Sequence, residues 1–251
     1  MQRMRRDITE IAPAPADGRV RYGDGENRFF DCWHGRRPAG LAVMVHGGFW
    51  RARYDLLHAS HLCATLAAEG MAVANLEYRR VGNPGGGWPG SLHDVMAGLN
   101  AARATLGRHL PTVLLGHSAG GHLALCAGSE SAGLAGIVAL APVADLALAQ
   151  RLNLSNGAAR KFMGAAPEEA PEAWRAADPA QRTCAARAIV VHGTADDVVP
   201  VSLSRSYAGA HALAATPPQL VEVAGADHFD VIDPESFAWP TVRDSALRLL
   251  G

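Results

Sequence analysis

The chain of 251 residues has very little lysine and no surplus of charge of either sign. Lys161 is the single lysine among 23 basic residues, and 24 acidic residues bring the net charge to −1. Proteins that bind nucleic acid or an anionic membrane usually carry a basic excess, so neither partner is expected here. We attribute the preference for arginine over lysine to the codon usage of a GC-rich genome, and no function follows from it.

Paired cysteines and metal-binding motifs are also lacking. The four cysteines are widely spaced, at Cys32, Cys63, Cys126 and Cys184. Because no CxxC pair occurs, neither a zinc ribbon nor a thioredoxin-type motif is expected. His58 and His61 can share one helical face, but no HExxH motif accompanies them. We therefore predict no metal and no other cofactor.

Long apolar runs are missing as well. The most apolar stretch, Leu134–Ala149, is interrupted by Pro142 and Asp145, and it falls short of the ~20 apolar residues of a transmembrane helix. The basic residues 1–13 contain neither the apolar core nor the small-residue cleavage site of a signal peptide. We expect a cytoplasmic protein.

What is present is a composition typical of a folded globular protein. Apolar residues make up 49% of the sequence and charged residues 19%, which excludes a disordered chain. Short apolar runs alternate with longer amphipathic segments. The runs predict strands at 41–46, 71–78, 111–116, 136–141, 188–192 and 219–223, and the segments predict helices at 58–69, 91–106, 119–128, 202–215 and 237–250.

This alternation indicates an α/β fold, with a mostly parallel sheet covered by helices on both faces. Two earlier strands, at 19–22 and 29–33, are expected to be antiparallel. Residues 144–184 break the pattern, since they are rich in alanine, proline and glutamate and contain only short helical pieces. We predict a single domain over residues 1–251, with 144–184 as a small helical cap inserted over one end of the sheet.

The segment Gly116–Gly120 (GHSAG) has the pattern G-x-S-x-G between a predicted strand and a predicted helix. That is the position of a nucleophile elbow, a sharp turn that exposes a serine hydroxyl at the carboxyl end of a sheet. Ser118 is the candidate nucleophile, and the backbone N–H of Ala119 is a candidate donor to developing negative charge. The alternative is a glycine-rich turn without a catalytic role.

A second glycine pair, in His46–Trp50 (HGGFW), follows the strand at 41–46. Glycines allow the backbone to approach a ligand closely and leave N–H groups free for an oxyanion. Gly48 and Phe49 are the expected donors, and Trp50 could wall a substrate pocket. An ordinary loop with a packed aromatic ring is the alternative.

An acid and a histidine follow two later strands. Asp196 comes after the strand at 188–192 and His228 after the strand at 219–223. A carboxylate in such a position can orient a histidine, and the chain order of Ser118, Asp196 and His228 is one of the known triad orders. Whether Asp197 or Asp230 assists stays open.

Together these motifs resemble the α/β-hydrolase superfamily from about Leu41 to the C-terminus. HGGFW, GHSAGG and DHFDVID are similar to segments of arylformamidases (kynurenine formamidases) and of related small carboxylesterases. The segments 77–80 and 87–89, followed by Asp94, resemble the tyrosine-containing strand end, the proline turn and the helix of the same group of proteins. HGG-x-W and GHSAGG also occur in feruloyl-esterase-like and peptidase-like domains. Phe49 stands where the formamidase loop usually has tyrosine.

The resemblance implies a serine hydrolase that cleaves a small ester or an aryl-formamide through an acyl-enzyme. Ser118, Asp196 and His228 would form the triad, and the oxyanion would bind at Gly48, Phe49 and Ala119. Substrate contacts are expected from Trp50, Trp88 and His117. The partner is then a small-molecule ester or amide, with the oligomeric state, including a homodimer, left open. The alternatives are an aminopeptidase-type hydrolase and a non-catalytic binding protein on the same fold.

Overall fold

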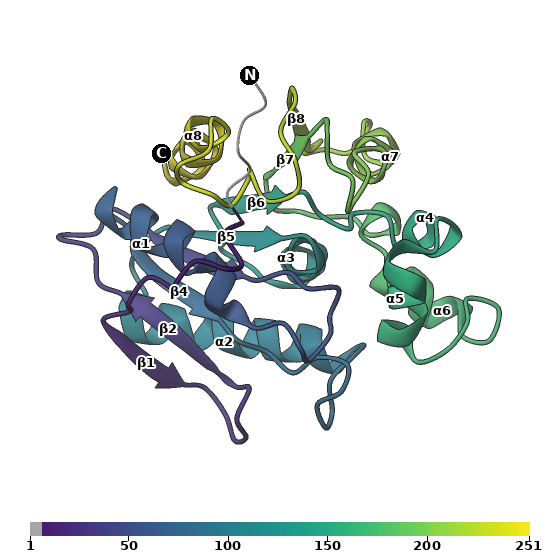
Figure 1. Ribbon diagram of the computed structural model, residues 1–251, viewed down its shortest axis with the longest axis horizontal. Helices are drawn as coiled ribbons and strands as arrows, with labels where there is room; N and C mark the ends of the chain where they lie inside the picture. Colours follow the sequence, from purple (N-terminus) through teal and green to yellow (C-terminus); the bar gives the residue numbers. More distant parts are fainter. Residues whose placement is uncertain (1–6) are drawn as a thin grey trace.

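A central eight-stranded sheet lies between two layers of helices in the computed structural model, which describes residues 7–251 (Figure 1). The strand order is β1-β2-β4-β3-β5-β6-β7-β8. Pairing is antiparallel between β1 (Gly18–Arg21) and β2 (Phe29–Trp33), and between β2 and β4 (Ala72–Leu76). All other neighbouring pairs are parallel. From β4 they run strand by strand through β3 (Leu41–Val45), β5 (Thr112–His117), β6 (Gly136–Leu140) and β7 (Ala188–Gly193) to β8 (Gln219–Val223). The mostly parallel sheet is as predicted.

The central strands are apolar on both faces because helices cover both faces. Every residue of β3, β4, β5, β6 and β7 is buried, which is why these strands appear in the sequence as unbroken apolar runs. The edge strands β1 and β8 are only partly buried.

Residues 1–6, which belong to the N-terminal stretch without signal-peptide features, lie outside the described residues. Over residues 7–251, no helix has both the length and the apolar character needed to cross a membrane.

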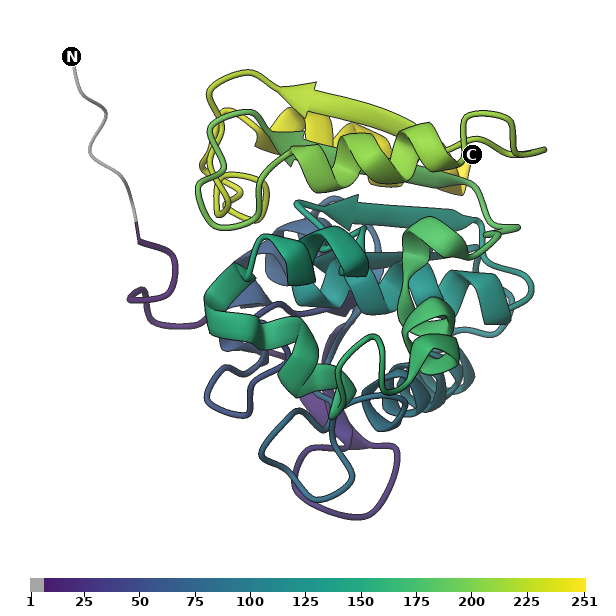
Figure 2. The ribbon, with the colours of Figure 1, turned by 90° about the vertical axis from the view of Figure 1, so that its right-hand side faces the viewer.

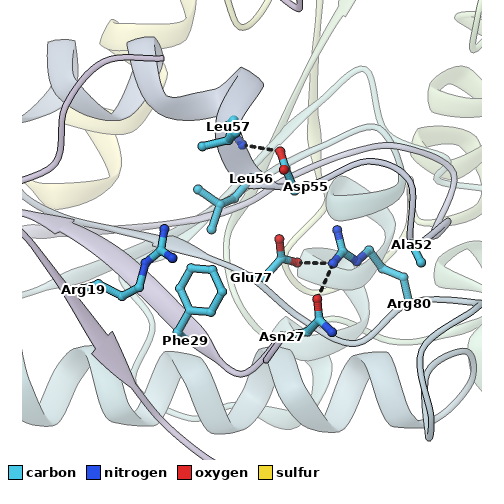
Figure 3. Close-up of a pocket in the computed structure, with 9 residues that line it drawn as sticks. All are labelled: Arg19, Asn27, Phe29, Ala52, Asp55, Leu56, Leu57, Glu77 and Arg80. Atoms are coloured by element: carbon cyan, nitrogen blue, oxygen red, sulfur yellow. Dashed lines mark hydrogen bonds and ion pairs between the residues drawn. The ribbon is translucent and has the colours of Figure 1, made fainter. Parts of the chain in front are cut away.

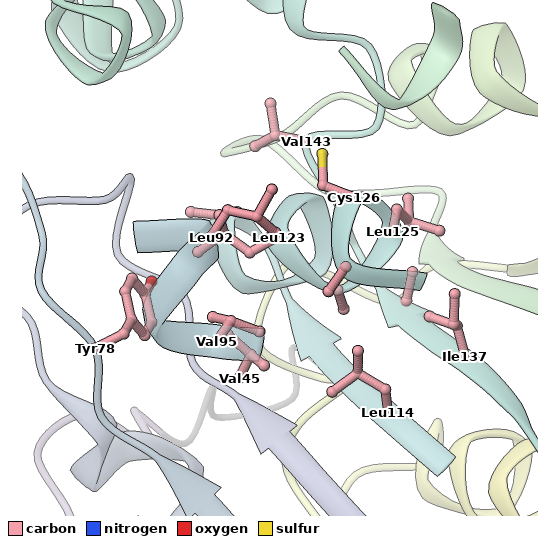
Figure 4. Close-up of a cluster of buried hydrophobic side chains, with 14 of the residues drawn as sticks. Val45, Tyr78, Leu92, Val95, Leu114, Leu123, Leu125, Cys126, Ile137 and Val143 are labelled. Carbon is pink, nitrogen blue, oxygen red and sulfur yellow. The ribbon is translucent and has the colours of Figure 1, made fainter. Parts of the chain in front are cut away.

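Each face of the sheet has its own helical layer. One layer contains α1 (Ser60–Ala68), preceded by a short 3-10 helix η1 (Leu56–Ala59), and α8 (Trp239–Leu250). The other contains α2 (Gly90–Leu106), α3 (Ala119–Glu130) and α7 (Ser202–Ala210) (Figure 1). Leu62 and Val242 belong to the buried cluster of the first layer, while Leu92 and Leu123 belong to that of the second (Figure 4). The helix expected over 202–215 ends at Ala210, and turns lead on to Pro217 and Pro218.

The segment between β6 and β7 forms α4 (Leu146–Arg151), α5 (Leu154–Met163), α6 (Pro171–Ala177) and a 3-10 turn η2 (Pro179–Gln181). Figure 2 shows these helices packed together in front of the sheet. Phe162 of α5 is 1% exposed, and its ring stacks on that of Trp50 with 4.5 Å between centroids. The same ring meets His122 of α3 edge-on at 5.5 Å. Phe162 therefore joins the inserted helices to the core.

We expect Phe162→Ala to lower the free energy of unfolding by about 3–5 kcal/mol, because it leaves a cavity beneath a buried stacked ring. Urea denaturation followed by circular dichroism measures the change. Leu152→Ala in the same insertion is the control, since that side chain is 46% exposed and should cost no more than about 0.5 kcal/mol. Equal losses in the two variants would contradict the anchoring role of Phe162.

Candidate active site

Ser118 lies on a sharp turn between β5 and α3, with φ of 55° and ψ of −118°. A non-glycine residue rarely adopts this conformation, which surrounding contacts must hold in place. The N–H of Ser118 donates to the carbonyl of Leu140 at 2.8 Å, and its carbonyl accepts from His122 and Val143. The turn is thereby tied to β6 and to the segment that follows it.

The glycines on either side of Ser118 are required by backbone contacts. A Cβ on Gly116 would lie 2.3 Å from the carbonyl oxygen of Gly120. A Cβ on Gly120 would lie 2.1 Å from the carbonyl oxygen of Val45, at the end of β3. Only glycine allows the first turn of α3 to approach both strands this closely. The G-x-S-x-G pattern is therefore the pattern of a tightly packed elbow.

Asp196 and His228 form a buried pair at the carboxyl ends of β7 and β8. Oδ2 of Asp196 lies 2.7 Å from Nδ1 of His228, while Oδ1 accepts from the N–H groups of Val198 and Val199 at 2.9 Å and 2.8 Å. Burial opposes ionisation of Asp196, but hydrogen bonds with His192 and His228 hold the pKa of its carboxyl well below the usual range. A carboxylate in this position accepts the Nδ1 proton and so leaves Nε2 of His228 able to act as a base.

Neighbouring side chains fix the carboxylate of Asp196. Nε2 of His192 lies 2.8 Å from the carbonyl of Val199, and this contact requires the proton to be on Nε2. The same Nε2 lies 3.2 Å from Asp196, and Ser204 then donates to Nδ1 of His192 at 2.6 Å.

The two other acids named in the sequence analysis, Asp197 and Asp230, lie in different surroundings. Asp197 is exposed. Asp230 binds the Asp227 N–H and the Ser236 hydroxyl, within the loop that carries His228.

Ser118 and His228 line one cavity of about 250 Å³. Its walls come from the loops that follow β3, β5, β7 and β8, from the approach to α1 and from the N-terminal segment. Parallel α/β sheets commonly bind their ligands at the carboxyl ends of the strands. The lining residues are Thr9, Gly48, Phe49, Tyr54, His58, His117, Ser118, Val198, His228 and Phe229.

The loop after β3 presents free backbone donors next to Ser118. Gly48 and Phe49 adopt positive φ angles of 110° and 48°. A Cβ on Gly47 would lie only 3.0 Å from Cβ of Ser118, so this loop runs directly beside the elbow. Among the described residues, the N–H groups of Gly48, Phe49 and Ala119 donate to no protein acceptor. These are the groups expected from the sequence to bind an oxyanion.

Buried charges lie behind this loop. His46 uses Nδ1 to contact the carbonyl of Gly47 at 2.8 Å and Nε2 to contact Oε1 of Glu77 at 3.0 Å. Burial opposes ionisation of Glu77, but His46 and Arg80 outweigh it and lower the pKa of the carboxyl. Arg80 lies 3.0 Å from the same oxygen. The carbonyl of Gly47 is thus connected through His46 to a buried ion pair.

Glu77 and Arg80 also line a second cavity of about 360 Å³ (Figure 3). In Figure 3 the Arg80 guanidinium lies between Glu77 and Asn27, whose Oδ1 it contacts at 2.8 Å. The segment 52–58 contributes to both cavities, since Tyr54 and His58 line the first and Asp55 lines the second. Arg80 also binds the carbonyl of Tyr54. The charged pair therefore supports a wall of the cavity above Ser118.

Two residues that the sequence suggested as substrate contacts lie away from the cavity above Ser118. Trp50 is 1% exposed and stacks on Phe162, and Trp88 packs against the same ring at 6.2 Å. Neither residue lines the cavity above Ser118, and no residue of 144–184 lines it. These tryptophans attach the inserted helices to the core. His117 does line the cavity, with Nε2 donating to the carbonyl of His228 at 2.9 Å.

Several lining residues carried no sequence signal that we recognised. The sequence marks His58 only as half of a possible metal-binding pair, yet its ring lies 5.8 Å from that of His46 and 6.2 Å from that of His117. Thr9 belongs to a segment without a motif or periodicity.

Among residues 7–251, no group of three or more histidine, cysteine, aspartate or glutamate side chains is arranged to hold a metal ion.

Comparison with known proteins gives the family of the chain. The BD-FAE family model matches residues 33–210, well over half of the chain. The chain belongs to the BD-FAE family. This BD-FAE chain is 28% identical over 244 residues to Esterase LipC of Mycobacterium tuberculosis (strain ATCC 25618 / H37Rv). That match covers 86% of this chain but spans only 60% of the length of LipC.

Solved structures confirm that this BD-FAE chain has the predicted α/β-hydrolase fold. A truncated carbohydrate esterase from gut microbiota superposes with a TM-score of 0.79 at 19% identity, over 96% of this chain and 99% of its own. A putative thioesterase from Silicibacter sp. superposes with a TM-score of 0.70 at 26% identity, over 89% of this chain and 83% of its own.

We expect His58→Gln to weaken the pH dependence of stability. Burial and the neighbouring His46 lower the pKa of His58 to about 3 from an ordinary 6.5. Between these values His58 binds a proton in the unfolded chain but not in the folded one, so the free energy of unfolding decreases as the pH falls. The contribution is about 1.4 kcal/mol per pH unit at most.

Urea denaturation at about pH 7 and pH 5 measures this change in slope. The wild-type protein should lose more stability than His58→Gln between the two conditions. His109→Gln, at an exposed histidine, should keep the wild-type slope. A His58→Gln protein with that same slope would show that His58 gains its proton as readily in the folded state as in the unfolded one.

Proposed function

We propose that this BD-FAE protein is a serine hydrolase that cleaves small carboxylic esters through an acyl-enzyme. The observation that carries the proposal is the Asp196–His228 hydrogen bond of 2.7 Å at a cavity that also contains Ser118 on a nucleophile elbow. The name of LipC, an esterase, supports the same class of reaction.

In the first half of the reaction, Ser118 Oγ attacks the ester carbonyl carbon while Nε2 of His228 takes the hydroxyl proton. The ionised Asp196 stabilises the resulting imidazolium and holds its Nδ1 proton. Collapse of the tetrahedral intermediate breaks the bond to the alcohol oxygen, which receives the proton from His228. Water then attacks the acyl-enzyme with the same assistance, releasing the acid and restoring Ser118.

The oxyanion of each intermediate would be stabilised by the N–H groups of Gly48, Phe49 and Ala119. Ala119 begins α3, so the positive end of that helix adds to the effect. Donors fixed before the reaction are effective because they do not reorganise as charge develops. The connection of Gly47 to His46 and Glu77 supports such a fixed arrangement.

The size and lining of the cavity favour a small substrate. About 250 Å³ suits a short acyl or aryl group, and Phe49 and Phe229 supply apolar rings. The same rings would accept the aryl part of an aryl-formamide. We therefore keep aryl-formamide hydrolysis, suggested by the likeness to arylformamidases, as a second candidate activity.

Ser118→Ala should abolish labelling by a fluorophosphonate probe, because the probe needs an activated serine oxygen. It should also lower kcat/KM for p-nitrophenyl acetate by at least about a thousandfold. Ser202→Ala, at an exposed serine on α7, is the matched control and should label fully. A folded wild-type protein that never labels would contradict the proposed function.

The two candidate activities are separated by comparing kcat/KM for short aryl esters and for N-formylkynurenine. The ester proposal predicts that the esters are the better substrates. Efficient cleavage of N-formylkynurenine with negligible ester hydrolysis would replace it by the formamidase activity.

Gly48→Ala should lower kcat by about a hundredfold, since disturbing one oxyanion donor has an effect of this size. The added methyl group would lie 2.5 Å from Cβ of Tyr54 at a φ of 110°, so the loop must shift. Gly70→Ala, with a φ of 94° and nothing within 4 Å of the added Cβ, imposes similar backbone strain away from the cavity. If both variants lost stability equally and kept wild-type kcat, Gly48 would have no role in the oxyanion site.

A further inference from the structure

One wall of the cavity above Ser118 comes from the N-terminal segment, residues 7–15, which precedes the part of the chain matched by the family model. Thr9 lines this cavity together with Phe49, Tyr54 and Phe229. Figure 2 shows the segment at the end of the molecule toward which β6 and β8 point. Neither the mechanism nor the family motifs use this wall.

The N-terminal segment is held in place at several points. Ile8 is 1% exposed and belongs to the same buried cluster as Val231 and Ile232, which follow His228 in the chain. Farther along, the N–H of Ala14 donates to Oγ of Ser60 at 2.9 Å. The carbonyl of Pro15 accepts from the indole N–H of Trp33 at 2.8 Å. Buried apolar area and hydrogen bonds thus fix both ends of the segment.

A local turn sets the position of Thr9 itself. Oδ1 of Asp7 accepts from the N–H of Thr9 at 2.9 Å and from its hydroxyl at 2.6 Å. The N–H of Glu10 donates to the carbonyl of Asp7 at 3.1 Å. Since the hydroxyl proton of Thr9 is already used, the side chain offers the cavity bulk rather than a hydrogen-bond donor.

We infer that Thr9, anchored by Ile8, is a specificity-determining residue that limits the length of the ester substrate that fits above Ser118. The inference rests on the proposed esterase function and adds a size limit to it. The hydrogen bonds of Thr9 go to Asp7, and none joins it to Asp196 or to the oxyanion donors. A change at Thr9 should therefore alter which esters are cleaved without altering the chemistry of cleavage.

The test uses the full chain and two panels of esters. One panel varies the acyl group from acetate through butyrate to octanoate with p-nitrophenol as the constant alcohol. The other varies the alcohol at constant acetate. In pockets of this kind one methylene changes kcat/KM by about 10- to 200-fold.

Thr9→Trp should lower kcat/KM for the longer members of one panel by about tenfold or more relative to the acetate, and Thr9→Ala should raise them. Ile8→Ala, which loosens the anchor, should act in the same direction as Thr9→Ala. Glu10→Trp is the matched control, because Glu10 is exposed like Thr9 but does not line the cavity. It should leave both panels unchanged.

A shift confined to either panel supports the inference and shows which part of the ester contacts Thr9. Unchanged profiles for both Thr9 variants, or an equal shift with Glu10→Trp, would overturn it. Fluorophosphonate labelling of Ser118 is measured in parallel. Absence of labelling in the wild-type protein would reject the proposed function, whereas normal labelling with unchanged profiles would reject only the role of Thr9.

Discussion

The close approach of the first turn of α3 to the ends of β3 and β5 is the constraint on which the site depends. Gly120 has no room for a side chain because the carbonyl of Val45 would lie 2.1 Å from its Cβ. This contact brings the loop after β3 beside the elbow, so that a Cβ on Gly47 would lie 3.0 Å from that of Ser118. The distance between the proposed nucleophile and its oxyanion donors is therefore set by glycine packing, before any polar interaction is considered.

Two separate groups of buried charges then hold the two polar parts of the site. Asp196 is fixed by backbone N–H groups and by His192 behind His228. Glu77 and Arg80 act on the other side, through His46, on the loop that begins at Gly47. Buried ion pairs add little net stability, because desolvation offsets their attraction. Their value here lies in orientation, which an apolar core could not give to a carbonyl group or an imidazole ring.

The site residues that can be predicted from the sequence are those whose positions follow from local pattern. Ser118, Asp196 and His228 each come directly after a buried parallel strand, and the carboxyl ends of such strands meet at one edge of the sheet. The sheet itself follows from apolar runs that are buried on both faces. Trp50 lies in the core and not at the cavity, because an aromatic residue in a loop can turn towards the core as readily as towards a ligand. Its actual partner, Phe162, lies far away in the sequence.

Thr9 and His58 were missed for the opposite reason, since no local pattern marks them. Each reaches the cavity only because a distant part of the chain lies across it. The cavity thus has a floor of motif residues and a rim that includes Thr9 of the N-terminal segment. The contacts of that segment, to Ser60, Trp33 and the cluster around Ile232, involve none of Ser118, Asp196 and His228. Sites without shared partners respond almost independently to substitution. In the proposed esterase, a rim of this kind can change the preferred ester length while the glycine packing beneath it, and the chemistry proposed for it, remain as they are.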